Sequence, residues 1–145
     1  MNRHNEMEAH FLSVPENEAF ARVVIAAFAM QLSPTMSEIA DVKTAVSEAV
    51  TNAIVHGYEG TRGMVIMRAR IDGATLAIEI SDRGKGISNV QQAMEPFYTT
   101  HPEQERSGMG FAVMQTFMDS VEVRSTPGIG TCVQMRKHIH QADAS

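Results

Sequence analysis

Apolar residues in the first half of the chain recur at helical spacing in two successive segments. Each segment follows a Ser/Thr-x-x-Glu pattern, at Ser13 and at Thr35, that is typical of a capping box. The first apolar stripe comprises Phe20, Val23, Val24, Ala27 and Phe28, and the second comprises Ile39, Val42, Val46, Val50 and Ala53. We therefore expect two amphipathic helices, the first ended by Pro34 and the second with Gly57 as its C-cap.

From Val65 onward the period changes to two, which is typical of strands. Apolar residues occupy every second position from Val65 to Ile71 and from Leu76 to Ile80. Between these two runs stands Asp72-Gly73, a pair that favours a tight hairpin turn. Two further strands are expected at 121–125 and 131–136.

The remaining segments are less regular. Apolar residues from Phe111 to Met118 predict a third helix, whereas residues 89–107 lack a period, and a loop of that length is usually functional or disordered. Residues 1–12 fit either an edge strand or a loose arm, and we expect the tail at 138–145 to be flexible. Together these elements predict a single α+β domain over 1–145. Its architecture would be a two-layer α/β sandwich, with a mixed, mostly antiparallel sheet and helices on one face.

Composition narrows the functional classes. The 145 residues are 43% hydrophobic and 20% charged, which is typical of a globular domain. A net charge of −5 argues against direct binding to nucleic acid, and no apolar run approaches the roughly 20 residues that a membrane span needs. The N-terminus is polar and does not resemble a secretory signal, and the single cysteine, Cys132, fits a reducing compartment. We therefore expect a cytoplasmic protein with no membrane partner.

Candidate chemistry begins on the second helix. Glu48 and Asn52 are four residues apart and share one helix face, with His56 one turn further on. An Asn carbonyl can ligate Mg²⁺ without adding charge, and Glu48 could accept a proton from an attacking hydroxyl. A solvated helix face is the plain alternative.

A glycine loop follows the second strand of the hairpin. Asp82 stands at the strand end, where its carboxylate could accept the exocyclic amine of adenine, and Gly84 and Gly86 would let the backbone approach the ring. A simple Asp-Gly turn would have the same local pattern.

A second glycine segment precedes the third helix. Backbone N–H groups of Ser107-Gly108-Met109-Gly110 could bind phosphate at the helix N-terminus, and Arg106 could reach a terminal phosphate. Alternatively, Ser107 is an N-cap and Arg106 is solvated. Because all three segments occur together and in this order, they indicate a nucleotide site.

The three segments resemble the N, G1 and G2 boxes of the ATPase superfamily shared by gyrase, heat-shock chaperones, mismatch-repair proteins and histidine kinases. Within it, segments 47–58, 96–100 and 105–111 are similar to the anti-sigma serine kinases. The resemblance extends from about Glu6 to His138 and is weakest in the loop 59–63 and at Lys85.

The resemblance implies a histidine-kinase-type ATPase fold, with Asn52 holding Mg²⁺, Glu48 as general base and residues 96–110 as an ATP lid. The residues it implies for ATP binding are Asn52, Asp82, Gly84, Gly86, Thr99, Thr100, Arg106, Ser107, Gly108, Met109, Gly110 and Thr131.

The resemblance also implies a function. The protein would be a homodimer that binds and inhibits a sporulation sigma factor when ATP is bound. It would be a protein-serine kinase that phosphorylates the anti-anti-sigma protein on serine. Arg22 would contact a partner, although a solvated pair with Glu18 is equally compatible with the sequence.

Three alternative functions remain at this point. One is an anti-sigma kinase of the general-stress type, which the ATP motifs cannot distinguish from the sporulation type. Another is a nucleotide-gated binding ATPase without kinase activity. A detached histidine-kinase catalytic domain is disfavoured, because none of His4, His10, His138 and His140 lies in a long dimerisation helix.

Overall fold

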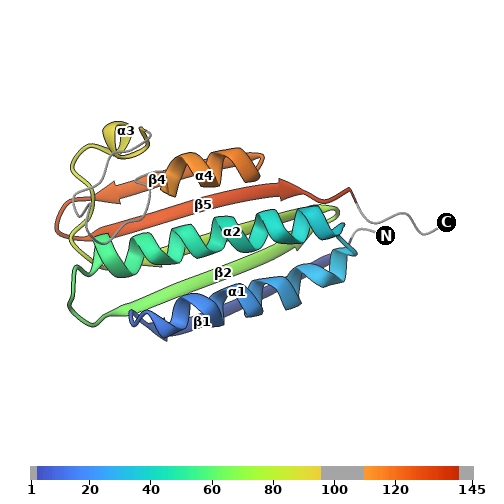
Figure 1. Ribbon diagram of the computed structural model, residues 1–145, viewed down its shortest axis with the longest axis horizontal. Helices are drawn as coiled ribbons and strands as arrows, with labels where there is room; N and C mark the ends of the chain where they lie inside the picture. The colour runs from blue at the N-terminus through green and yellow to red at the C-terminus, as the bar shows by residue number, and fades with distance from the viewer. Residues whose placement is uncertain (1–2, 96–109, 141–145) are drawn as a thin grey trace.

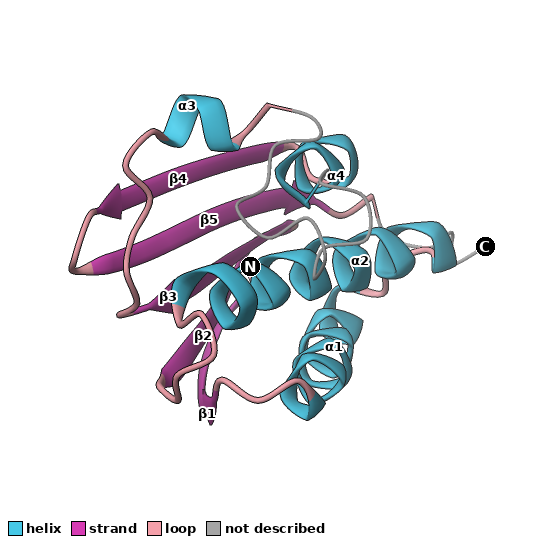
Figure 2. Cartoon of the chain, turned by 60° about the vertical axis from the view of Figure 1, so that its left-hand side comes forward, coloured by secondary structure: helices cyan, strands magenta, loops and turns pink. Residues whose placement is uncertain are grey.

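The structure is a computed structural model that describes residues 3–95 and 110–140. A five-stranded sheet has the order β1-β2-β3-β5-β4, and α1, α2 and α4 cover one of its faces (Figures 1 and 2). The strands are β1 (His4–Leu12), β2 (Met64–Asp72), β3 (Thr75–Asp82), β4 (Ser120–Thr126) and β5 (Gly130–His138). The helices are α1 (Glu16–Ala29), α2 (Met36–Asn52), α3 (Val90–Ala93) and α4 (Gly110–Phe117), with a 3₁₀ turn η1 (Met30–Leu32) and a π-helical turn η2 (Ala53–Gly57).

The sheet confirms the predicted α+β sandwich. Every strand pairing among the described residues is antiparallel, so the sheet contains none of the parallel pairing that a mixed sheet would have. The predicted hairpin is present, with Asp72 opposite Thr75 and Gly73 in a left-handed conformation. Residues 4–12 form an edge strand along β2, which decides between the two possibilities that the sequence left open.

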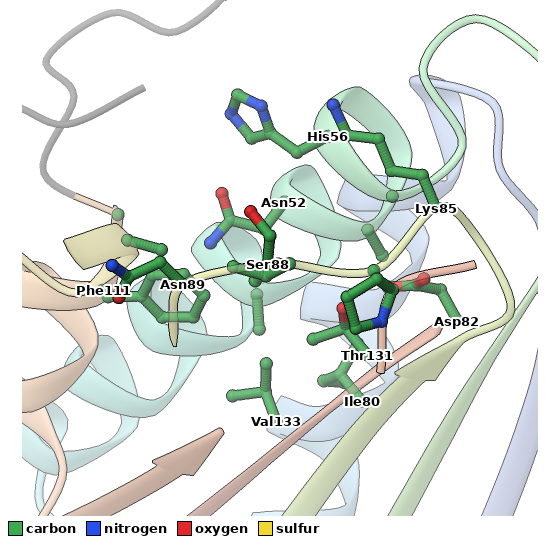
Figure 3. A pocket seen from close by; sticks show the side chains of 18 residues that line it. Asn52, His56, Ile80, Asp82, Lys85, Ser88, Asn89, Phe111, Thr131 and Val133 are labelled. Carbon is green, nitrogen blue, oxygen red and sulfur yellow. The ribbon is translucent and has the colours of Figure 1, made fainter. Parts of the chain in front are cut away.

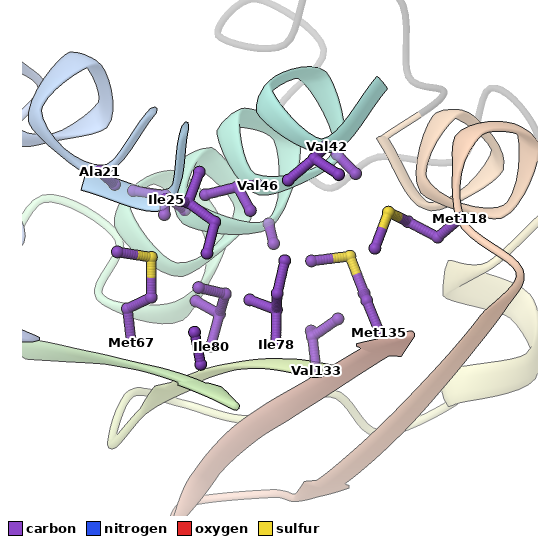
Figure 4. Close-up of a cluster of buried hydrophobic side chains, with 14 of the residues drawn as sticks. Ala21, Ile25, Val42, Val46, Met67, Ile78, Ile80, Met118, Val133 and Met135 are labelled. Atoms are coloured by element: carbon purple, nitrogen blue, oxygen red, sulfur yellow. The ribbon is translucent and has the colours of Figure 1, made fainter. Parts of the chain in front are cut away.

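Apolar side chains from the helices meet those from the inner face of the sheet to form the core. Val42 and Val46 of α2 and Ile25 of α1 are buried over Ile78 and Met135 of the central strands (Figure 4). The inward residues of β2 and β3 are the apolar positions of the predicted alternation. Helix α2 therefore lies in a fixed position across the middle of the sheet.

The first helix departs from the prediction in its cap and in its apolar face. Ser13 does not cap α1, because its hydroxyl donates to the Thr61 carbonyl and accepts from the Gly63 N–H. Phe20 is 48% exposed and Val23 is 67% exposed, so the predicted stripe of α1 is only partly buried. The residues of α1 that reach the core are Ala21, Ile25, Phe28 and Ala29.

The second helix begins as predicted and ends differently. Thr35 and Glu38 form a complete capping box. Gly57 is not a C-cap; it is the last residue of η2, and Tyr58 follows in a right-handed helical conformation. Single π-turns of this kind occur often at functional sites.

The first residues after β5 contact the domain. Ile139 is buried, and the His140 N–H donates to Glu38 Oε2 at 2.9 Å. Residues 138–140 therefore pack on the domain, while 141–145 lie outside the described residues and their flexibility stays a prediction.

Candidate nucleotide-binding site

A pocket of about 260 Å³ lies between the C-terminal half of α2 and the sheet. Asn52 and His56 line it from the helical side, and Ile80 and Val133 line it from β3 and β5 (Figure 3). Apolar walls with a few polar groups are characteristic of small-molecule sites. The pocket suits a flat, partly apolar ligand such as a nucleobase.

Asp82 is one of the polar residues that line this pocket. It is the last residue of β3, opposite Thr131 of β5, and both residues line the pocket. Burial raises the pKa of the Asp82 carboxyl, and hydrogen bonds from the N–H groups of Gly84 and Thr131 partly oppose that rise. A desolvated carboxylate is a strong acceptor for an amine that enters the pocket.

The glycines after Asp82 are required by close backbone contacts. A Cβ on Gly84 would overlap the Gly57 carbonyl, and a Cβ on Gly86 would overlap the backbone of Thr126. Gly86 also has φ +76°, which side chains rarely adopt. These two glycines let the loop pack between η2 and the β4–β5 turn. Of the two, only Gly86 lines the pocket among the described residues.

Asn52 has an unusual environment for an amide. Its Nδ2 atom is buried and has no hydrogen-bond partner among the described residues, and the residue lines the pocket. A buried donor without a partner costs free energy unless a ligand supplies an acceptor. An oxygen-rich ligand with its Mg²⁺ would fit this position, because the amide offers one carbonyl ligand and one donor.

The other predicted site residues either belong to the described part of the chain, as Gly110 and Glu48 do, or lie outside it. Gly110 lines the pocket with Phe111, whereas Glu48, one turn before Asn52 on α2, is not among the described lining residues. The lid 96–110 lies outside the described residues except for Gly110. The predicted ATP-binding residues that also lie outside them are Thr99, Thr100, Arg106, Ser107, Gly108 and Met109.

Several lining residues were not predicted. Ile87 and Asn89 follow the glycine loop, Lys85 lies within it, and Phe111 is the second residue of α4. Val133 was recognisable only as a residue of a predicted strand. Lys85 lines the pocket and pairs with Glu59 at 3.1 Å, so the two places where the resemblance is weakest contact each other.

Arg22 lies on α1, outside the pocket lining. Its Nε is 3.4 Å from Glu18 Oε1, as expected for residues four apart. Glu18 also accepts a hydrogen bond from the Ser47 hydroxyl of α2. The pair therefore connects α1 to the residue that precedes Glu48.

Comparisons with known proteins agree with this geometry. The family described as "Histidine kinase-like ATPase domain" matches residues 11–137. An anti-sigma F factor of Thermoanaerobacter sp. (strain X514) is 60% identical over 135 residues, which cover 93% of this chain and 94% of that protein. The anti-sigma F factor of Caldanaerobacter subterraneus subsp. tengcongensis is 59% identical over 139 residues, covering 96% and 97%. That of Clostridium acetobutylicum is 56% identical over 133 residues, covering 92% and 93%.

A solved structure supports the fold independently. The crystal structure of the RsbU and RsbW domains of a Mycobacterium tuberculosis protein matches with a TM-score of 0.68 at 17% identity. The match covers 93% of this chain and 32% of that one. In the described part of the chain, no helix combines the length and apolar character that a membrane crossing requires. Fold, family match and close relatives agree: the chain belongs to the anti-sigma F factor family, within the histidine kinase-like ATPase domains.

Proposed function

We propose that this protein is an ATP-dependent anti-sigma factor that binds and inhibits a sporulation sigma factor and phosphorylates its anti-anti-sigma antagonist on serine. The observation that carries the proposal is the pocket that joins Asn52 of α2 to the Asp82 loop. The relatives bear the name anti-sigma F factor, which supports a sigma factor as the partner. A homodimer in the cytoplasm is part of the same proposal.

The pocket supplies groups for both ends of ATP. Asp82 would accept a hydrogen bond from the adenine amine, and Gly86 would let the ring approach the backbone. Asn52 would hold Mg²⁺ through its side-chain carbonyl, and the bound ion would neutralise charge on the phosphate oxygens. Arg106 and the segment 107–110 would contact the phosphates, as the resemblance implies.

The transfer step is a displacement at the γ-phosphorus. The serine oxygen of the antagonist forms a bond to phosphorus, the bond to the β–γ bridging oxygen breaks, and ADP leaves. Glu48 would accept the proton of the serine hydroxyl. Because Glu48 lies one helical turn before Asn52, one helix would position both groups.

The test replaces the proposed base and leaves the nucleotide pocket intact. We expect Glu48→Gln to bind Mg-ATP within about twofold of wild type and to lose at least about a hundredfold in serine phosphorylation. Phosphotransfer is measured with γ-labelled ATP and the purified antagonist, and ATP affinity by calorimetry. Glu122→Gln, the same chemical change on exposed β4, is the control. Full activity of Glu48→Gln would remove Glu48 as the base.

One observation favours a second candidate. Since Glu48 is not among the described residues that line the pocket, the nucleotide could serve only to gate a binding surface. That protein would release ADP or retain ATP without forming any phosphoprotein. The same labelled assay separates the two functions.

A further inference from the structure

The end of the α2–η2 helical segment is bonded to the loop after β3. The Lys85 N–H donates to the Gly57 carbonyl at 2.8 Å, and the Arg83 N–H donates to the Tyr58 hydroxyl at 2.8 Å. Glu59 pairs with the Lys85 ammonium at 3.1 Å. Three consecutive residues, 57–59, therefore contact the stretch 83–85, directly after Asp82.

Tyr58 makes the most enclosed of these contacts. Its side chain belongs to the buried core, and its hydroxyl donates to the Met64 carbonyl at 2.5 Å while accepting from Arg83. The ring packs so closely on Gly63 that a Cβ there would overlap it. The hydroxyl is thus fixed between β2 and the Asp82 loop.

The neighbouring contacts contribute differently. Gly57 acts through its backbone carbonyl, which a different residue at this position would still carry. The Glu59 and Lys85 side chains are 41% and 40% exposed, and exposed ion pairs stabilise little. Among these three residues, Tyr58 is therefore the side chain that can hold the loop.

We propose that Tyr58 is a positioning residue for adenine recognition: its hydroxyl fixes the backbone at Arg83 and so orients the Asp82 carboxylate toward the base. Tyr58 does not itself line the pocket. The Asp82 Oδ1 accepts from the Gly84 N–H at 2.9 Å, so both neighbours of Arg83 take part in one constrained turn. The inference rests on the proposed ATP-binding function and assigns a role to a residue for which the resemblance implied none.

The test compares two ligands that differ in one group. ATP carries the exocyclic amine that Asp82 would accept, and purine riboside triphosphate lacks it. Wild type should prefer ATP. Tyr58→Phe removes the hydroxyl that bonds to the Arg83 N–H and the Met64 carbonyl. We expect the affinity of this variant for ATP to fall about tenfold and its affinity for the analogue to change little. The preference for ATP should therefore shrink by about the same factor.

Two further variants separate positioning from general stability. Glu59→Gln removes the exposed charge pair and should leave the preference within about twofold of wild type. Gly63→Ala pushes against the Tyr58 ring and should reduce the preference as Tyr58→Phe does. Thermal unfolding is measured for each variant, because a purely structural role would lower the melting temperature without changing the ratio of the two affinities.

The outcomes distinguish the two proposals. A reduced ratio in Tyr58→Phe and Gly63→Ala, with Glu59→Gln unchanged, supports the positioning role. An unchanged ratio in Tyr58→Phe overturns it and leaves the proposed function standing. A wild-type protein that binds both nucleotides equally also overturns it. A wild-type protein that binds neither overturns the proposed function as well.

Discussion

Glu38 joins the start of the nucleotide-site helix α2 to the segment that follows β5, and its removal is the prediction that the structure quantifies best. Oε1 accepts from the Thr35 N–H at 2.9 Å, and Oε2 accepts from the His140 N–H at 2.9 Å. His140 Nδ1 lies 3.0 Å from the same Oε2. The side chain is buried, and the perturbation we choose is Glu38→Gln.

The expected loss of folding free energy follows from the pKa of the Glu38 carboxyl. Burial alone would raise it, but the hydrogen bonds from His140 and Thr35 outweigh burial and lower the pKa from 4.5 to about 2. That difference corresponds to roughly 3 kcal/mol of folding free energy. Because the folded-state pKa is the lower one, the stabilisation is fully present above pH 4.5 and is lost as the pH falls toward 2.

The assay is urea unfolding of wild type and Glu38→Gln at pH 7 and at pH 3. We expect the variant to be less stable by about 2–3 kcal/mol at pH 7, because its side chain cannot ionise, and the difference to shrink at pH 3. Glu122→Gln on the exposed face of β4 is the control and should change stability by less than about 0.5 kcal/mol. An equal difference between wild type and Glu38→Gln at both pH values would refute the reasoning.

Three further predictions concern the pocket and the partner surface. First, ATP affinity, measured by calorimetry, should fall as the pH is lowered, because a protonated Asp82 accepts the adenine amine less well. Since burial raises the pKa of Asp82, the fall should begin at a higher pH than it would for an aspartate with a pKa of 3.8. The same pH profile in Asp82→Asn would contradict this prediction. Gly84→Ala should weaken ATP binding at least about tenfold in the same assay, because its Cβ would overlap the Gly57 carbonyl; unchanged affinity would show that the loop can move aside. Arg22→Glu should abolish capture of the sigma factor in a pulldown and leave ATP affinity intact; unchanged capture would remove Arg22 from the partner surface.

Features set by local chemistry were predictable from the sequence. The Thr35 capping box depends on residues three apart, and the turn at Gly73 needs a left-handed conformation that glycine adopts readily. Both formed as expected.

Features decided by distant contacts were not predictable. Ser13 fits a capping box, but the loop at 61–63 takes its hydroxyl. Phe20 has the spacing of a core residue, yet it lies at the edge, with its ring 6.0 Å from that of Phe11 and nearly half of its surface exposed. The hydrophobic pattern predicts which residues share one helix face, but it does not predict how much of that face the sheet covers.

The site shows the same division. Asn52 and Asp82 belong to motifs that can be recognised in the sequence, and both residues line one pocket in the structure. Tyr58 and Lys85 gain their positions only when η2 packs against the glycine loop, and no spacing in the sequence indicates that contact. Sequence therefore predicts the chemical groups of the site better than the residues that hold them in place.

The most direct test of the central claim is a single labelling experiment. The purified protein is incubated with Mg²⁺, γ-labelled ATP and the anti-anti-sigma protein, with Glu48→Gln beside it. The proposed function predicts label on a serine of the anti-anti-sigma protein with wild type and almost none with the variant. Bound ATP with no labelled protein in either reaction would contradict the kinase function and favour a nucleotide-gated binding protein.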